Sequence, residues 1–442
     1  MPVMNQRPTE ALSYNPNDQV YWDAEALKTE FDRVYDICHG CRLCHNLCPS
    51  FPDLFKALDN DPDVDGDVLN LKTEQHRAIV DHCYQCKLCY VKCPYTPGDG
   101  HDFALDFPRL MLRAKAQRVK KEGMSLGDKI LSDPDKVGKM ATILPMVSNW
   151  ANENVVNRLV MQGALGIDKR KQLPTFTSET FRKWFNKRGA GENLGTNGKV
   201  VLFYTCFTNY NDPSVGRDVV EVLERNDVEV VCPEQNCCGM PAIDVGDIDF
   251  AVEQAASNIR SLYPYVEQGY DIVCANPTCT YMLKKEYTEL MGTTKAAAVA
   301  EATYDVSEWL VALAKQKKLD RNFIGDEIGK IVYHVPCHLK AQNVGFKSRD
   351  LLRILPGAEV ELVDRCCAHD GTWAMRKDYF EISMQWGGKA FEGMQNAKAN
   401  IAVSDCPPAA IHIEQATGIK PQHPISVLNR WYAPLDSDGD KG

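Results

Sequence analysis

The alternation of apolar and polar residues divides the chain into a helical N-terminal part and a C-terminal part of mixed strands and helices. Apolar residues recur at helical spacing in segments 23–38 and 71–83, and each predicted helix leads into a group of cysteines. Residues 108–121 predict another helix, which carries six basic residues and no acidic residue between positions 109 and 121. The pattern therefore predicts an all-helical fold for the first part of the chain.

From Lys199 onward, short apolar runs of strand length alternate with helical segments such as 215–226. Strands that alternate with helices along a chain form parallel sheets. The pattern therefore predicts an α/β architecture, with strands in segments 199–206, 228–233, 270–277, 330–337, 360–367 and 400–406.

This α/β part contains an internal repeat, which is visible in its cysteines. The matching positions are Cys206 and Cys337, the pair Cys237 and Cys238 with the pair Cys366 and Cys367, and Cys279 with Cys406. The offsets are 131, 129 and 127 residues, which indicates a duplication of about 130 residues.

Composition limits the kind of protein. The chain has 442 residues, of which 44% are hydrophobic and 25% charged, and its formal net charge is -10. These values are typical of a globular protein of two to four domains, and the acidic balance argues against nucleic acid as a partner. The N-terminal segment lacks the apolar stretch of a signal peptide. We therefore expect a cytoplasmic protein whose 18 cysteines are reduced and free to bind metal.

Two cysteine runs share the spacing C-x2-C-x2-C-x3-C-P, one from Cys38 to Pro49 and one from Cys83 to Pro94. This is the bacterial ferredoxin pattern, in which the fourth cysteine of each run binds the cluster of the other run. Zinc is the alternative, but zinc sites usually combine two separate C-x2-C pairs. The spacing predicts two 4Fe-4S clusters, one held by Cys38, Cys41, Cys44 and Cys93 and one held by Cys83, Cys86, Cys89 and Cys48.

Each α/β half adds four cysteines at or just after strand ends, where parallel sheets place their ligand sites. An adjacent cysteine pair alone is more often structural, but a pair joined by two strand-end cysteines, twice over, indicates metal binding. We predict one or two further iron–sulfur clusters, held by Cys206, Cys237, Cys238 and Cys279 in the first half and by Cys337, Cys366, Cys367 and Cys406 in the second.

The chain resembles the family of anaerobic glycerol-3-phosphate dehydrogenase C subunits, within the broader group related to heterodisulfide reductase. The resemblance runs from about Asp36 to Leu428 and rests on both ferredoxin runs and on the motifs LPTFTSETFRKWF, CFTNYNDPSVGRDVVEVL, NCCGMP, PTCTYML, VPCHLK and QHPISVL. It implies that the two α/β halves are the cysteine-rich CCG domains of that family, whose clusters can be non-cubane.

The resemblance also gives the expected architecture, an α+β multidomain chain. Residues 1–105 are expected to form an all-helical ferredoxin domain with two 4Fe-4S clusters, and residues 106–198 a helical basic and apolar connecting segment. Residues 199–328 and 329–442 are expected to form the first and second CCG domains, each with a parallel sheet.

The expected function is that of an iron–sulfur electron-transfer subunit. It would relay single electrons between a partner oxidoreductase and a quinone, disulfide or peroxidase-type acceptor, with turnover in the partner. The partner would be a flavoprotein dehydrogenase of the glycerol-3-phosphate type or a rubrerythrin-like protein, since no strand is followed by G-x-G-x-x-G. The alternative is a self-sufficient reductase that acts on a disulfide or similar acceptor at a CCG cluster.

The chain departs from the family pattern at three positions. Asn276 and Ala409 stand where thiols of a C-x-x-C motif are expected, and Ala368 replaces the glycine of CCG. We therefore expect unequal halves, with the second holding a labile cluster, one of higher potential, or none.

Five other residues have open roles. Cys232 is interpreted as a buried strand residue, whereas Cys274 is equally a structural residue or a fifth thiolate. His334, His338 and His369 could supply nitrogen ligands, although hydrogen bonding near the site is the favoured interpretation.

Residues 140–167 form an apolar-rich segment around Trp150 between two basic segments. In an acidic protein, this arrangement suits peripheral contact with an anionic membrane, such as the inner face of the cytoplasmic membrane, or with an acidic partner. Helices packed between domains are the alternative, and periodicity alone does not separate the two.

Overall fold

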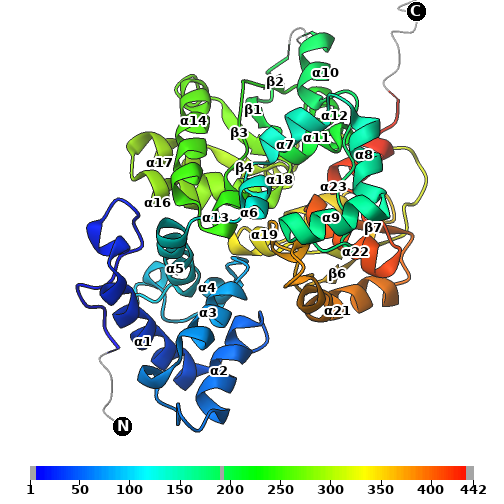
Figure 1. The fold of residues 1–442 in the computed structure, drawn as a ribbon. Coiled ribbons are helices and arrows are strands. Elements are labelled where there is room, and N and C mark those ends of the chain that lie inside the picture. Colours follow the sequence, from blue (N-terminus) through cyan, green and yellow to red (C-terminus); the bar gives the residue numbers. More distant parts are fainter. Residues whose placement is uncertain (1–5, 190–193, 435–442) are drawn as a thin grey trace, which may run out of the picture.

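A computed structural model describes residues 6–189 and 194–434 of the chain (Figure 1). Its N-terminal part, up to residue 189, consists of η1 (Gln19–Trp22), α1 (Ala24–Cys41), α2 (Ser50–Asn60), η2 (Val68–Asn70), α3 (Thr73–Asp81), α4 (Leu88–Lys92), η3 (Pro97–Asp99), α5 (Phe107–Glu122), α6 (Leu126–Leu131), α7 (Pro134–Ala141), α8 (Pro145–Glu153), α9 (Val155–Leu165) and α10 (Phe181–Arg188). The three helices predicted from the apolar pattern correspond to α1, α3 and α5. Residues 6–189 contain no strand, which confirms the all-helical prediction for the part described.

Capping side chains fix where two of these helices begin. Asp23 precedes α1 and accepts a hydrogen bond from the backbone N–H of Ala26 at 2.7 Å. Asp106 precedes α5 and accepts one from the backbone N–H of Arg109 at 2.9 Å. A cap of this kind satisfies an otherwise unpaired N–H group and contributes about 1 kcal/mol. The helix that carries the first cysteines and the basic helix therefore both have defined starts.

The first half of the α/β part has a four-stranded parallel sheet in the order β2-β1-β3-β4. Its elements are β1 (Lys199–Phe203), α11 (Cys206–Tyr210), α12 (Pro213–Arg225), β2 (Glu229–Val231), α13 (Met240–Val245), α14 (Ile248–Val266), β3 (Asp271–Cys274), α15 (Pro277–Tyr281), η4 (Met282–Glu286), α16 (Tyr287–Met291), α17 (Thr294–Glu301), β4 (Thr303–Asp305) and α18 (Val306–Lys315). The strand β4 is not predicted, because its residues Thr303, Tyr304 and Asp305 form no apolar run.

The second half repeats this plan with a parallel sheet in the order β6-β5-β7. Its elements are β5 (Lys330–His334), α19 (Cys337–Ala341), α20 (Lys347–Leu352), β6 (Glu359–Val363), η5 (Trp373–Met375), α21 (Phe380–Asn396), β7 (Ile401–Ser404), α22 (Pro407–Thr417) and α23 (Pro424–Trp431). A single parallel bridge between Val403 and Gln422 takes the place of β4. The two sheets confirm the predicted α/β duplication.

Strand register identifies equivalent residues in the two halves. Phe203, the last residue of β1, lies opposite Cys274 in β3, and His334, the last residue of β5, lies opposite Ser404 in β7. Counting onward from these positions, the equivalent pairs are Cys274 and Ser404, Asn276 and Cys406, and Cys279 and Ala409.

This register corrects one expectation from the sequence. Similar spacing matches Cys279 with Cys406, but Cys406 occupies the position of Asn276 at the start of a helix, and Cys279 lies one turn further on. Each half has therefore kept a different one of the two thiols that the family motif contains.

The last helix of each half bridges the two halves. The helix α18 ends the first half, where it contacts β3 and β4, and it also packs against α20 of the second half. The helix α23 ends the second half, where it contacts α20, and it also packs against α12 of the first half. Hydrogen bonds cross both contacts: Ser348 Oγ donates to Ser307 Oγ at 2.8 Å, and Asn429 Nδ2 donates to Asp218 Oδ1 at 2.9 Å. One hydrophobic core therefore extends through both halves.

The helices α1 to α4, blue in Figure 1, lie beside this duplicated unit and share part of their core with it. Trp373 of the second half is buried in that core and donates a hydrogen bond from Nε1 to the carbonyl oxygen of Asp81 at 2.8 Å. Within the part of the chain that the structure describes, no helix has the length and apolar character needed to cross a lipid bilayer.

Candidate iron–sulfur sites

The two cysteine runs converge at two sites, and each site takes cysteines from both runs. At the first, burial and then the nearby thiols of Cys44, Cys93 and Cys41 raise the pKa of Cys38 well above its usual value. These four cysteines also line one small cavity. We call this set the outer ferredoxin site, because its Cys41 is exposed to solvent.

The second set comprises Cys48, Cys83, Cys86 and Cys89, all of which are buried, and we call it the inner ferredoxin site. Burial, followed by the thiols of Cys86 and Cys48, raises the pKa of Cys89 well above its usual value. Cys44 of the outer site adds to the same shift. The two ferredoxin sites are therefore direct neighbours.

The same backbone turn shapes both cysteine runs. Arg42 and Lys87 each follow the second cysteine of their run, and both adopt the left-handed conformation, with φ angles of 55° and 63°. This conformation costs a residue other than glycine about 1–2 kcal/mol. The same strained turn therefore occurs at equivalent positions of the two runs, between the second and the third cysteine of each run.

The chemistry around these sulfur atoms fits iron–sulfur clusters. Backbone N–H of Tyr95 lies 3.4 Å from Cys93 Sγ, and Gln85 Nε2 lies 3.5 Å from Cys83 Sγ. Such N–H donors near the sulfurs are among the contacts that tune cluster potentials. Burial disfavours the thiolates in the metal-free protein, so binding of iron would release protons from these thiols.

Among residues 6–189 and 194–434, no group of three or more His, Cys, Asp and Glu side chains is placed to hold one metal ion.

The first half brings its four predicted cysteines into a continuous row. Side-chain contacts join Cys206 to Cys237, Cys237 to Cys238, and Cys238 to Cys279. The thiol of Cys274 is buried next to this row. Burial is the main cause that raises the pKa of Cys274, and the nearby thiol of Cys238 is the second. We call the row the first cysteine-rich site.

Two polar residues complete this site. Asn276, which stands at a missing thiol position, caps α15 by accepting a hydrogen bond from the backbone N–H of Thr278 at 2.9 Å. Asp135 of the connecting helix α7 accepts a hydrogen bond from the backbone N–H of Cys237, and burial raises the pKa of its carboxyl group. No sequence signal marks Asp135, since it lies far along the chain from any cysteine.

The second half gathers Cys337, Cys366, Cys367 and Cys406, which we call the second cysteine-rich site. The Sγ atoms of Cys337 and Cys366 are 3.3 Å apart, and contact with Cys337 is the main cause that lowers the pKa of Cys366 to about 7. After burial, the thiols of Cys366 and Cys406 contribute most to raising the pKa of Cys367. All four predicted cysteines therefore meet.

The loop after Cys367 keeps the shape of a CCG loop without its glycine. Ala368 has a φ of 56°, and its counterpart Gly239 in the first half has a φ of 90°. The backbone N–H of Ala368 lies 3.2 Å from Cys366 Sγ. The alanine therefore adopts a backbone conformation that favours glycine, and the turn places its N–H against a sulfur.

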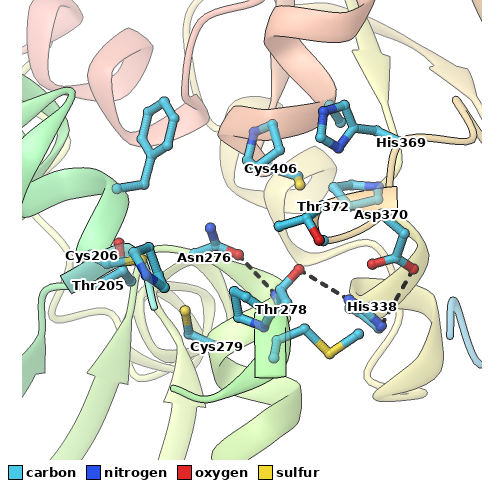
Figure 2. Close-up of a pocket in the computed structure, with 18 of the residues that line it drawn as sticks. Thr205, Cys206, Asn276, Thr278, Cys279, His338, His369, Asp370, Thr372 and Cys406 are labelled. Carbon is cyan, nitrogen blue, oxygen red and sulfur yellow. Dashed lines mark hydrogen bonds and ion pairs between the residues drawn. The ribbon is translucent and has the colours of Figure 1, made fainter. Parts of the chain in front are cut away.

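Both cysteine-rich sites line one cavity of about 190 Å³ between the two halves, which we call the central cavity (Figure 2). All eight cysteines of the two sites contribute to its lining. Neither Cys232 nor Cys274 reaches it, and Cys232 Sγ instead lies 3.8 Å from the carbonyl oxygen of Leu202. No pattern in the sequence indicates that the two sites face each other.

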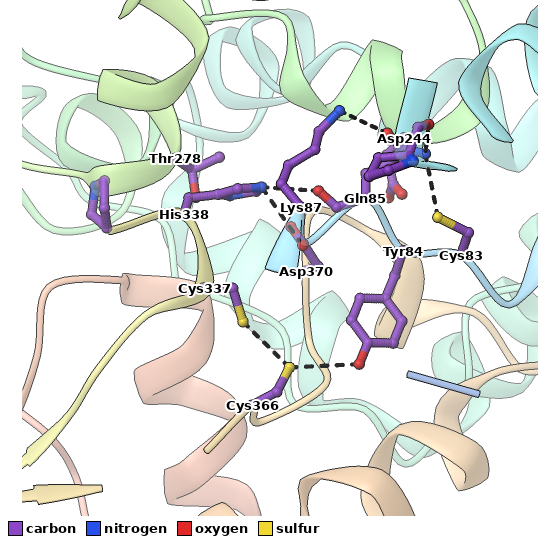
Figure 3. A network of polar contacts seen from close by, with 12 residues as sticks. Cys83, Tyr84, Gln85, Lys87, Asp244, Thr278, Cys337, His338, Cys366 and Asp370 are labelled. Atoms are coloured by element: carbon purple, nitrogen blue, oxygen red, sulfur yellow. Dashed lines mark hydrogen bonds and ion pairs between the residues drawn. The ribbon is translucent and has the colours of Figure 1, made fainter. Parts of the chain in front are cut away.

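The inner ferredoxin site adjoins the second cysteine-rich site. Figure 3 shows Tyr84 with its hydroxyl group directed at Cys366, and the distance from Oη to Sγ is 3.6 Å. Burial is the main cause that raises the pKa of Cys86, and the nearby thiol of Cys366 is the second. Tyr84 and Cys86 belong to the second ferredoxin run, so the run that holds the inner site also contacts the second half.

Comparison with known proteins agrees with this arrangement. The family model "4Fe-4S dicluster domain" matches residues 32–94, and the model "Cysteine-rich domain" (CCG) matches residues 200–284 and again residues 331–414. These matches confirm the predicted fold class and the prediction that the chain carries several iron–sulfur clusters.

The chain is also similar to individual known proteins. The chain is 30% identical over 313 residues to the C subunit of the anaerobic glycerol-3-phosphate dehydrogenase of Escherichia coli (strain K12), covering 69% of this chain and 76% of that protein. It is 28% identical over 306 residues to the B subunit of the fumarate reductase (CoM/CoB) of Methanothermobacter marburgensis, and the match covers 66% of this chain and 58% of that protein. It is 30% identical over 220 residues to "Lactate utilization protein A" of Bacillus pumilus, and the match covers 47% of this chain and 87% of that protein. The chain therefore belongs to the family of the anaerobic glycerol-3-phosphate dehydrogenase C subunits and is a multi-cluster iron–sulfur protein of electron transfer.

Proposed function

We propose that the chain relays single electrons in a fixed order: outer ferredoxin site, inner ferredoxin site, second cysteine-rich site and central cavity. The contact of Tyr84 with Cys366 carries this proposal, because it joins the ferredoxin part to the cavity. The proposal takes the four cysteine groups as cluster ligands. It also divides the chain as residues 1–105, 106–198, 199–328 and 329–442, for the ferredoxin clusters, the connecting segment and the two CCG domains.

Electrons would enter at the outer ferredoxin site, since its exposed Cys41 lies close to the surface. The neighbouring Leu43 is 45% exposed, which gives a docking protein an apolar contact beside the cluster. The partner we propose is an oxidoreductase of the flavoprotein dehydrogenase class, since the relative from Escherichia coli is named as one of the subunits of a dehydrogenase. A rubrerythrin-like protein is the second candidate.

The acceptor would be reduced at the central cavity or through it, and a disulfide, a quinone or a peroxidase-type partner are the candidate classes. A self-sufficient reductase is the competing function, because all eight thiols of the cysteine-rich sites line the cavity. Steady turnover of a disulfide by the purified chain with a dithionite-reduced dye would favour that alternative. Electron transfer without turnover would favour the relay.

Rapid-freeze EPR tests the order of the relay. Reduced flavodoxin, a protein too large for the central cavity, would be mixed anaerobically with the full-length chain. In Cys89→Ser, which damages the inner site, reduction of the cysteine-rich clusters should fall to a small fraction of the wild-type rate. Cys232→Ser is the matched control and should behave like wild type, because Cys232 lies outside all four groups. An unchanged rate in Cys89→Ser would contradict the order.

We further propose that the chain contacts an anionic membrane surface through the helices around Trp150. The structure leaves their apolar side chains in solvent, so packing between domains does not account for them. Exposed apolar groups of this extent mark interaction surfaces, and basic segments lie on either side in sequence. We call this surface the α8–α9 patch; it comprises Met140, Ile143, Leu144, Met146, Val147, Trp150, Val155, Val156, Leu159 and Val160.

A further inference from the structure

The second half carries three histidines where the first half carries apolar side chains. All three line the central cavity beside the second cysteine-rich site. Strand register and the adjacent cysteine pairs give the equivalences His334 with Phe203, His338 with Phe207, and His369 with Met240. The duplicated framework therefore offers imidazole nitrogens on one side of the cavity only.

Two of these histidines have hydrogen-bond partners, as the favoured interpretation of the sequence expects. His338 Nδ1 lies 3.0 Å from Thr278 Oγ1, and its Nε2 lies 3.1 Å from the carbonyl oxygen of Gln85. His334 Nδ1 lies 3.1 Å from Ser404 Oγ, which anchors its ring at the strand end, whereas its Nε2 is buried without a hydrogen-bond partner. Hydrogen bonds therefore account for both ring nitrogens of His338 and for one ring nitrogen of His334.

His369 is different. Its side chain is nearly fully buried, with 2% exposure, and its Nδ1 has no hydrogen-bond partner. Within residues 6–189 and 194–434, no hydrogen bond reaches either nitrogen of this ring, and its aromatic neighbour is the edge-on ring of His412 at 5.2 Å between centroids. A buried polar atom without a partner costs free energy, and one explanation is that it binds a metal or cluster.

The backbone around His369 is held in an unusual shape beside the cysteines. Ala368 and Asp370, on either side of it, have φ angles of 56° and 26°. Strain of this kind persists where the surroundings hold it in place and is concentrated at functional sites. Figure 2 shows His369 and Cys406 on the same side of the central cavity, and Ala409, which replaces the missing thiol, lines that cavity too.

We propose that His369 supplies a ring nitrogen to the cluster of the second cysteine-rich site, in place of the thiolate that is absent at Ala409. This rests on the proposed function, which assigns a cluster to that site. A neutral imidazole in place of a thiolate removes negative charge and raises the reduction potential of a cluster. Electrons arriving from the inner ferredoxin site would therefore collect next to the central cavity.

Pulsed EPR on the full-length protein tests the proposal directly. Protein labelled with nitrogen-15 in histidine alone would be purified anaerobically and poised where its highest-potential cluster becomes paramagnetic. That signal should disappear in Cys367→Ser, which assigns it to the second cysteine-rich site. We expect coupling of the cluster to a histidine nitrogen-15 in wild type and in His334→Gln, and loss of that coupling in His369→Gln.

His369→Cys adds a second test, because it places a thiol in the lining of the cavity that Ala409 also lines. This variant should keep its iron, lose the nitrogen coupling and show a lower midpoint potential than wild type. The ferredoxin signals at low potential should be unchanged in every histidine variant, which controls for folding.

Three results would overturn the inference, and the third would also overturn part of the proposed function. Coupling that persists in His369→Gln, or that is absent from wild type while the cluster is present, removes the histidine ligand and leaves the relay intact. Iron content that is the same in wild type and in a Cys366→Ser, Cys367→Ser double variant would mean that the site holds no cluster. That result would overturn both the inference and the cluster assignment within the proposed function.

Discussion

Lys87 and Glu286 form an ion pair with a nitrogen–oxygen distance of 3.0 Å, and their side chains are only 3% and 2% exposed. Lys87 belongs to the second cysteine run and Glu286 to the first cysteine-rich half, so the pair joins the two parts of the chain. Arg109 lies 3.8 Å from the same carboxylate and 3.0 Å from Glu289. The buried carboxylate of Glu286 therefore faces two cations.

Removal of the charge on Glu286 should destabilise the protein strongly. Glu286→Gln removes the carboxylate that pairs with the buried ammonium group of Lys87 and leaves neutral Gln85 Oε1, at 2.9 Å, as its acceptor; loss of one partner of a buried pair typically costs about 3–5 kcal/mol. The matched control is Glu361→Gln, because Glu361 pairs with Lys330 at 2.7 Å in an exposed position. That pair should contribute about 1 kcal/mol or less. Urea unfolding followed by circular dichroism would compare the variants, and equal midpoints would contradict the prediction.

The same pair should make stability depend on pH. Burial would raise the pKa of Glu286, but the charges of Lys87 and Arg109 outweigh burial and lower it to about 2. An unfolded glutamate has a pKa of about 4.3, so this stabilisation is complete above that value and is lost as the pH falls from about 4.3 toward about 2.

The measurement is the difference in free energy of unfolding between wild type and Glu286→Gln, followed from neutral to acidic pH. The comparison cancels effects that both proteins share, including acid loss of clusters. The difference should be constant down to about pH 5 and shrink below about pH 4.3. A difference that stays constant into that acidic range would contradict the assigned role.

Cys48→Ser should damage the cluster of the other run. Cys48 lies in the first run, yet its thiol belongs to the inner ferredoxin site. Burial is the main cause that raises the pKa of Cys48, and the nearby thiol of Cys83 is the second. Iron analysis and EPR of the anaerobically purified variant should show the inner cluster lost or altered and the outer cluster retained. Cys232→Ser should match wild type. Loss of the outer cluster alone would refute the exchange of fourth cysteines between the runs.

The α8–α9 patch should bind anionic vesicles at low salt. Met146 and Trp150 are 86% and 59% exposed, so an aspartate at either position should reduce flotation with vesicles of anionic lipid. Leu69→Asp is the matched control, because Leu69 is 51% exposed and lies outside the patch. High salt should weaken binding by screening. Absence of binding by wild type at low salt would leave a protein partner as the occupant of the patch.

The two cysteine-rich halves should not fold separately. The helices α18 and α23 each pack against the opposite half, so residues 199–328 or 329–442 expressed alone would expose core side chains. We expect each fragment to lack a cooperative unfolding transition and the co-expressed pair to regain one. Cooperative unfolding of either fragment alone would contradict the shared core. A comparison of the clusters in the two halves therefore requires the full-length chain.

Local patterns were sufficient for much of the fold. Apolar periodicity predicts α1, α3 and α5, and every strand except β4 overlaps a predicted segment. Spacing within the ferredoxin runs also predicts the grouping that the structure brings together, because a short loop restricts where its thiols can point. The match of Cys279 with Cys406 failed because a three-residue shift within one helical turn leaves the cysteine spacing almost unchanged.

Contacts between distant segments could not be predicted in this way. Nothing near Tyr84 in the sequence indicates that it lies against Cys366, and nothing near Asp135 indicates that it contacts the backbone of Cys237. The exposure of the α8–α9 patch is likewise a tertiary property, since a buried and an exposed apolar helix face have the same period. The central cavity arises only when both halves are in place.

The packing of α18 and α23 against both halves has a mechanical consequence. Two α/β units joined by a simple linker can hinge apart, but here α18 and α23 each pack against both halves. This packing opposes changes in the distance between sulfur atoms on opposite walls of the central cavity. Electron tunnelling falls off exponentially with distance, so this clasped arrangement keeps the tunnelling gap, and with it the transfer rate, insensitive to thermal motion.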